Sequence, residues 1–204
     1  MSEWRRSGWW SPARWYTVLG FAVLVFSLWL PWLSASRTTR VENRADGLAE
    51  CLLEVASEFP MPIDEADKQC ILARFFALAV SRGLRTSRIE RIEPAPDDVL
   101  LCLENKHYTF QLSVSPPDAQ QQPGKGTVPA IEVIAWPSTA VGPGHGAFFY
   151  PENAERAYTR NLRKSYHGLG DDRPKPGAAH RRPGLGSGRP MQYTGDDGEH
   201  WKLF

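Results

Sequence analysis

The sequence predicts an α+β protein that a single N-terminal transmembrane helix holds in a membrane. Three patterns support this: a long uncharged apolar stretch near the N-terminus, two segments with helical apolar spacing, and later segments that alternate apolar and polar residues. We expect a two-helix hairpin packed on a small antiparallel sheet of about four strands, followed by a disordered basic C-terminal tail. A chain of 204 residues holds one compact domain and appendages rather than two full domains.

The chain divides into seven expected segments. These are a short basic tail (1–14), a transmembrane signal-anchor (15–35), a juxtamembrane linker (36–44), an α+β globular domain (45–150), a short helix (151–166), a Gly/Pro/Arg-rich linker (167–190) and an aromatic C-terminal segment (191–204).

The predicted transmembrane segment covers residues 15–35. No charged side chain lies between Arg14 and Arg37, and about 20 apolar residues suffice to cross a bilayer's hydrocarbon core. Six of the eight tryptophans lie within the first 32 positions, and indole rings favour the membrane interface. Two alternatives stay open: a cleaved signal peptide, for which residues 34–36 offer a small-residue cleavage site, and a buried helix of a soluble protein.

The orientation prediction rests on the short N-terminal tail, because the flanking arginines are equal in number on both sides of the apolar stretch. Signal-anchors and signal peptides both export the chain on their C-terminal side, so we expect an extracytoplasmic C-terminal domain in a bacterial-type cell envelope. The expected partners are the lipid bilayer and either envelope proteins or an anionic polymer. Nucleic acid would require a cytoplasmic domain and is not expected, and the oligomeric state stays open.

Two helices begin the globular domain. Residues 45–59 gather apolar side chains on one face and three glutamates on the other, which is typical of a solvated helix face. The Pro-Met-Pro sequence at 60–62 ends this helix. Asp64, with Asp67 three residues later, forms a capping box that begins a second helix, which runs to about Gly83.

The short connection makes these helices antiparallel neighbours and places Cys51 and Cys70 at about the same level. In an exported domain the two cysteines can form a disulfide, which typically stabilises a protein by roughly 2–4 kcal/mol. The alternative is two reduced cysteines packed as small apolar groups. Cys102, on a later strand, is expected to be an inert thiol that points away from the main core.

The strands come after the helices. Residues 99–104 and 107–114 predict a hairpin around a two-residue turn, in which Leu101 faces Phe110 and Leu103 faces Tyr108. Further strands are expected over residues 87–92, 130–136 and 148–150.

The tail carries the excess basic charge, with nine basic and two acidic side chains between residues 156 and 190. Residues 167–190 bury too little apolar surface to order themselves and are expected to form a flexible linker. The aromatic segment 191–204 predicts a short docking element that returns to the body or engages a partner. Candidates for contact with a polyanion are Arg173, Lys175, Arg181, Arg182 and Arg189.

The sequence offers no motif for catalysis, a cofactor or a metal. The GxGxxG, P-loop, GxSxG, HExxH and CxxC patterns are all absent. We therefore predict no catalytic, cofactor-binding or metal-binding residue. A hydrolase with an unrecognised site is the enzymatic alternative, and it requires His145, His200 and nearby carboxylates to converge in one pocket.

From residue 15 to about residue 150, a hydrophobic N-terminal helix leads into a helical segment and an antiparallel meander. This layout resembles that of type IV pilin-like proteins. Gly20-Phe21 matches the Gly-Phe cleavage site of that family, but Val25 stands where the family has a glutamate. The resemblance implies a pilin-like or secretion-system assembly subunit with one continuous helix from membrane to body. Our main expectation is a non-catalytic, single-pass membrane-anchored envelope protein with an exported interaction domain.

Overall fold

A computed structural model of the chain describes residues 12–95, 99–115, 130–152, 155–180 and 192–204. The chain divides into two compact units, Met1–Arg37 and Thr38–Phe204. The second unit combines helices with an antiparallel sheet, which confirms the predicted α+β class. The sheet has eight strands rather than about four.

Helix α1 runs from Pro12 to Ala56. Over residues 15–33 its side chains are uncharged and exposed, and by length and composition this part is apolar enough to cross a membrane. The sequence predicts a separate linker over residues 36–44, whereas the structure has these residues inside α1. No glycine or proline lies between Pro31 and Gly47, so nothing in the sequence interrupts the helix there.

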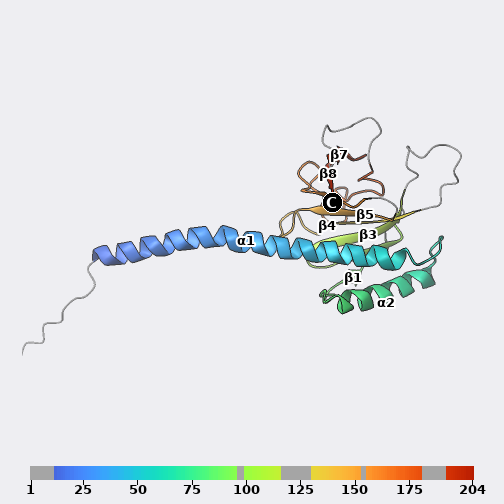
Figure 1. Cartoon of the computed structure of the whole chain (residues 1–204), viewed down its shortest axis with the longest axis horizontal. Helices are drawn as coiled ribbons and strands as arrows, with labels where there is room; N and C mark the ends of the chain where they lie inside the picture. The colour runs from blue at the N-terminus through green and yellow to red at the C-terminus, as the bar shows by residue number, and fades with distance from the viewer. Residues whose placement is uncertain (1–11, 96–98, 116–129, 153–154, 181–191) are drawn as a thin grey trace, which may run out of the picture. The chain divides into compact units, whose positions relative to one another are not determined.

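Helix α2 spans Glu65–Ser81, and its predicted capping box is confirmed. Asp64 accepts the backbone N–H of Asp67 at 2.8 Å, and the Asp67 carboxylate accepts the N–H of Asp64 at 3.2 Å. Helix α2 lies beside the C-terminal part of α1, and both bury their apolar faces in one core against the sheet (Figure 1).

The sheet is antiparallel throughout, in the order β1-β2-β3-β4-β5-β6-β8-β7. The first six strands form a meander, and the last two form a hairpin that joins β6 through β8. Their bounds are β1 Glu90–Arg91, β2 Leu101–Glu104, β3 Tyr108–Val114, β4 Ile131–Pro137, β5 Ala147–Pro151, β6 Ala157–Thr159, β7 Gln192–Thr194 and β8 His200–Leu203.

The sheet separates two hydrophobic cores. On β4, Val133 and Ala135 belong to the core shared with the helices, whereas Ile134 and Trp136 belong to a core on the opposite face. This is the period-two alternation of a strand that is buried on both sides. The C-terminal part of the chain closes the second core with Tyr166, Ala178, Ala179, Tyr193 and Trp201.

The structure contradicts the predicted helix and part of the predicted flexible linker of the C-terminal tail, and it agrees with the predicted docking of the aromatic segment on the body. Residues 151–166 contain strand β6 instead of a helix, and the aromatic segment docks on the body as β7 and β8. Part of the expected flexible linker is packed, because Ala178 and Ala179 are buried in the second core. Buried aromatic side chains such as Trp201 supply the apolar area that the Gly/Pro/Arg-rich composition lacks. Residues 181–191 of the predicted linker lie outside the described residues.

The β2–β3 hairpin is confirmed as an element, but its predicted register is wrong by two residues. Leu101 pairs with Leu112, and Leu103 pairs with Phe110. The connection is longer than a two-residue turn because the Asn105 side-chain carbonyl accepts two backbone N–H groups that come shortly after it in the chain. A shift of two residues keeps the same side chains facing the helices, so the predicted core is unaffected.

Candidate functional site

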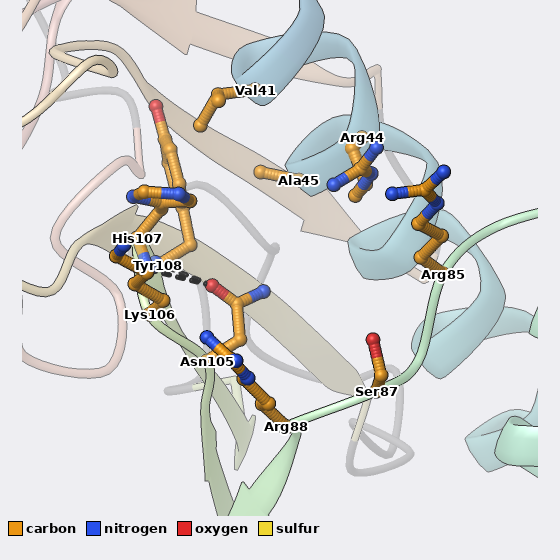
Figure 2. A pocket seen from close by; sticks show the side chains of 10 residues that line it. All are labelled: Val41, Arg44, Ala45, Arg85, Ser87, Arg88, Asn105, Lys106, His107 and Tyr108. Atoms are coloured by element: carbon orange, nitrogen blue, oxygen red, sulfur yellow. Dashed lines mark hydrogen bonds between the residues drawn. The ribbon is translucent and has the colours of Figure 1, made fainter.

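A pocket of about 320 Å³ opens beside α1 in the second unit (Figure 2). Three segments that are far apart in sequence form it: α1, the α2–β1 connection and the β2–β3 connection. We call it the cationic pocket. Its lining residues are Val41, Arg44, Ala45, Arg85, Ser87, Arg88, Asn105, Lys106, His107 and Tyr108.

The β2–β3 side of the cationic pocket is held by a closed set of hydrogen bonds. The Asn105 side-chain carbonyl accepts the backbone N–H groups of His107 at 2.8 Å and Tyr108 at 2.9 Å. The Asn105 N–H donates to the Tyr108 carbonyl at 2.8 Å. The buried Tyr108 hydroxyl donates to the Gly146 carbonyl at 2.8 Å. Lys106 therefore projects from a backbone that is fixed at both ends.

The α2–β1 side begins at the end of α2. The Leu84 N–H donates to the Ala79 carbonyl at 2.9 Å, and the Leu84 side chain packs on the helical core. Gly83 and Arg88 have positive φ angles of 71° and 69°. Arginine seldom adopts this left-handed conformation, and such residues are concentrated at functional sites.

The charge of the pocket is one-sided. Among the described residues that line it, three are arginines, one is a lysine and none is a carboxylate. Within the described part of the chain, no ion pair involves any of these four cationic side chains. They are Arg44, Arg85, Arg88 and Lys106.

Other arginines of the same unit are neutralised. Each lies within 2.5–2.7 Å of at least one glutamate oxygen, and these arginines are Arg74, Arg82, Arg91 and Arg156. Glu42 lies on α1 next to the pocket residue Val41, but its carboxylate is engaged elsewhere. It accepts the backbone N–H groups of His145 at 3.1 Å and Gly146 at 3.0 Å. Because like charges repel, the cationic pocket is an arrangement that an anion would stabilise.

A second polar cluster lies on the opposite face of the sheet around Glu132, which is fully buried. Its carboxylate accepts the Gly177 N–H at 2.6 Å and the Ser115 hydroxyl at 2.7 Å. His180 Nε2 lies 3.0 Å from the same carboxylate and 3.2 Å from Ser115 Oγ. Ser113 Oγ is more distant, at 3.4 Å from the carboxylate.

The Glu132 cluster has the residue types of a Ser-His-Glu triad but not its geometry. In a triad, one imidazole nitrogen contacts the serine and the other contacts the carboxylate. Here Ser115 and Glu132 both contact Nε2 of His180, so proton transfer from serine through the ring to the carboxylate has no route. The arrangement instead fastens the segment before β7 to strand β4.

The predicted disulfide pair is not joined in the structure, where both cysteines are free thiols. Cys51 is fully buried and lies 3.6 Å from the Arg82 guanidinium, whereas Cys70 is exposed on α2. Burial raises the pKa of Cys51, and it raises the pKa of Cys102 to about 12. Cys102 belongs to neither core, so its predicted position away from the main core is confirmed.

The structure describes two of the five predicted polyanion contacts. Lys175 is exposed, and Arg173 is half-buried with its guanidinium 3.4 Å from Gln111 Oε1. The other three, Arg181, Arg182 and Arg189, lie outside the described residues.

The histidines of the hydrolase alternative lie in different elements. His145 is in the β4–β5 connection, and its backbone N–H is bonded to Glu42. His200 is on β8, with its ring 3.4 Å from Thr194 Oγ1. Within the described residues, no group of three His, Cys, Asp or Glu side chains is placed to hold a metal ion.

The sequence interpretation missed the cationic pocket, although a signal was present. Arg82, Arg85, Arg88 and Arg91 recur at every third position. The net acidic balance of the surrounding segment hides this run. Only the fold separates its members, because Arg82 and Arg91 pair with glutamates and the other two do not.

Comparison with known proteins identifies no relative of this chain. No protein-family model, curated protein sequence or solved structure matches it.

Proposed function

We propose that this chain is a non-catalytic, single-pass membrane-anchored envelope protein whose folded unit binds an anionic group in the cationic pocket. The observation that carries the proposal is the set of four cationic side chains without an acidic partner among the described residues. The pocket volume of about 320 Å³ lies at the lower end of the range of small-ligand sites. Binding of an anion would relieve the mutual repulsion of these side chains.

The membrane part of the proposal rests on α1. Its residues 15–33 expose large apolar side chains and carry no charge, so they need an apolar environment. We further propose that this helix is a retained signal-anchor and that the folded unit is extracytoplasmic. This orientation is the one that signal-anchors impose, because they export the chain on their C-terminal side.

A binding role is favoured over hydrolysis by the geometry of the polar groups. The described residues that line the cationic pocket supply donors, positive charges and one imidazole, that of His107, but no carboxylate to orient or assist this imidazole as a general base. The Glu132 cluster holds the segment before β7 against strand β4 by hydrogen bonds, which is a structural role. The interaction partner is therefore expected to be held rather than transformed.

The test is anion binding by the full chain in a neutral detergent such as dodecyl maltoside. Inorganic phosphate, citrate and polyglutamate are titrated by calorimetry at low and at moderate salt. We expect saturable binding of at least one of these anions, weaker at the higher salt concentration because screening reduces the attraction. The double variant Arg85→Glu/Arg88→Glu should lose this binding.

The matched control is Arg160→Glu/Lys202→Glu, which reverses the same amount of charge at two exposed positions outside the pocket. This control should bind like the unmodified chain. Equal loss in both double variants would show that net charge and not the pocket governs binding, and the proposal would then fail.

The second candidate is a pilin-like or secretion-system assembly subunit, which the uninterrupted helix α1 favours. Its C-terminal part packs on an antiparallel sheet, in the layout that the resemblance implies. Val25 at the position of the family's glutamate argues the other way. The double variant Leu19→Cys/Leu24→Cys separates the two roles, because it puts two exposed thiols on different sides of α1. Membrane crosslinking of an assembly subunit should then give a ladder of oligomers, whereas a simple anchor should stay mainly monomeric.

A further inference from the structure

We propose that the anion in the cationic pocket is the phosphate of an anionic phospholipid headgroup from the bilayer that holds α1. This inference rests on the proposed anion-binding function and names its ligand class. It concerns only the second unit, which contains all of the lining residues.

The donors of the pocket suit a phosphate. Guanidinium groups are planar forks that bind two phosphate oxygens at once, and three arginines line this pocket with a lysine as an additional point charge. Neutral donors complete the set. The Asn105 carbonyl is occupied by two backbone N–H groups, which leaves its amide NH₂ as a donor, and the Ser87 hydroxyl also lines the pocket (Figure 2). A tetrahedral oxyanion has acceptors in enough directions to use them.

One wall of the pocket is apolar. Val41 on α1 is half-buried and keeps some carbon surface open to the pocket, whereas Ala45 and Tyr108, which also line it, are almost fully buried (Figure 2). A purely ionic ligand would leave the exposed carbon surface of Val41 in contact with water. The glycerol and upper acyl carbons of a phospholipid would cover it, so the pocket is matched to an amphiphile.

Chain connectivity favours a lipid over a free phosphate. Leu33, near the end of the apolar stretch, and Arg44, in the pocket, can be no more than about 40 Å apart even in an extended chain. Lipids that surround the stretch are therefore present at a high effective concentration. Arg37 and Arg40 are exposed between these two positions. Basic residues that follow a membrane segment attract anionic headgroups.

The experiment compares one headgroup with and without its acyl chains. The full chain in dodecyl maltoside is titrated with dioctanoyl phosphatidylglycerol, with glycerophosphoglycerol and with dioctanoyl phosphatidylcholine, and bound ligand is counted by native mass spectrometry. We expect one saturable phosphatidylglycerol site, at least tenfold tighter than the sites for the other two ligands. The Arg85→Glu/Arg88→Glu variant should lose this preference, and Arg160→Glu/Lys202→Glu should keep it.

Because charge reversal can disturb folding, the melting temperature of each variant is measured alongside. A milder pair, Arg85→Gln/Arg88→Gln, removes the charges without reversing them and should also abolish the preference.

Four outcomes would overturn the inference, and they are distinguishable. Equal affinity for phosphatidylglycerol and glycerophosphoglycerol would assign the pocket to a soluble phosphate and not to a lipid. Binding of citrate or polyglutamate, with no binding of any phosphate compound, would refute the phospholipid as ligand but would still support the proposed anion-binding function. Absence of binding to every anion would refute both the phospholipid ligand and the anion-binding function. Equal affinity for phosphatidylcholine would show that acyl chains alone drive the contact.

Discussion

At the scale of single residues, Glu132 matters most for the second face of the sheet. Its buried carboxylate receives hydrogen bonds from Gly177 and Ser115, and His180 lies beside it. These partners come from the segment before β7 and from the residue after β3. One side chain therefore joins three parts of the chain on the second face of the sheet.

Replacement of Glu132 by alanine should lower the free energy of unfolding by about 3 kcal/mol. The variant leaves the buried Gly177 N–H without an acceptor, which costs about 1–3 kcal/mol, and adds a cavity. Urea unfolding of the full chain, followed by tryptophan fluorescence, measures the change. Glu155→Ala, at an exposed position, should stay within about 0.5 kcal/mol of the unmodified chain. Equal stability of the two variants would refute the fastening role of Glu132.

Asp197, between β7 and β8, should make stability depend on pH. Burial raises its pKa from 3.8 to about 6, so the native state holds this proton more tightly than the unfolded chain does. The resulting stabilisation is complete below about pH 3.8 and is lost as pH rises through about 6. An acid that ionises in the native state at neutral pH is thus a source of instability there.

The neutral variant Asp197→Asn should be more stable than the unmodified chain near pH 7, by about 1–2 kcal/mol. A shift of about two pKa units corresponds to roughly 3 kcal/mol, and partial exposure of the side chain reduces this. Asparagine keeps the carbonyl that accepts the Glu199 N–H. The advantage should shrink towards pH 4 in thermal melts. An advantage that is the same at both pH values would rule out the titration of Asp197 as its cause.

At the scale of elements, the β4–β5 connection depends on the close approach of Gly144 to a buried ring. A Cβ atom at Gly144 would lie 2.6 Å from Tyr108 Cε2, and Tyr108 is fixed by its hydroxyl bond to the Gly146 carbonyl. Gly144→Ala should therefore destabilise by about 2 kcal/mol through overpacking. Gly142→Ala is the matched control, because its Cβ would meet only Thr139, at 3.3 Å, in an exposed part of the connection. Equal melting temperatures of the two variants would contradict this account.

The elements also show how far the sequence could predict the fold. The helices and the strands β2–β5 follow from apolar periodicity, which depends on neighbouring residues only. Strands β6, β7 and β8 have three or four residues each, too few for alternation to stand out in a Gly- and Pro-rich region. The register of the β2–β3 hairpin depended on a side-chain hydrogen bond of Asn105, which spacing does not reveal.

At the scale of the whole molecule, the cationic pocket could not be predicted because it depends on long-range folding. Arg44 comes from α1, Arg85 and Arg88 from the connection after α2, and Lys106 from the β2–β3 connection. In sequence, the acidic residues around them give this region a net negative charge. Which cations remain without a partner is decided by the positions of the glutamates in the fold, as the pair between Arg82 and Glu54 illustrates.

The whole molecule also provides its own reporter of orientation. Cys51 and Cys102 are buried and their pKa values are raised, so both are poor nucleophiles, whereas Cys70 is exposed. A membrane-impermeant maleimide should therefore label one thiol per folded chain in detergent. After treatment with a reductant, intact cells should give the same labelling if the domain is extracytoplasmic. The variant Cys70→Ser should abolish it in both settings.

The possible results separate orientation from cysteine pairing. Labelling of intact cells only after reduction would mean that Cys70 is oxidised in the exported domain, and a mass measurement would show whether its partner is Cys51. Labelling only after the cells are lysed would place the folded unit in the cytoplasm. The predicted export would then be wrong, and the anionic lipids available to the cationic pocket would be those of the inner leaflet.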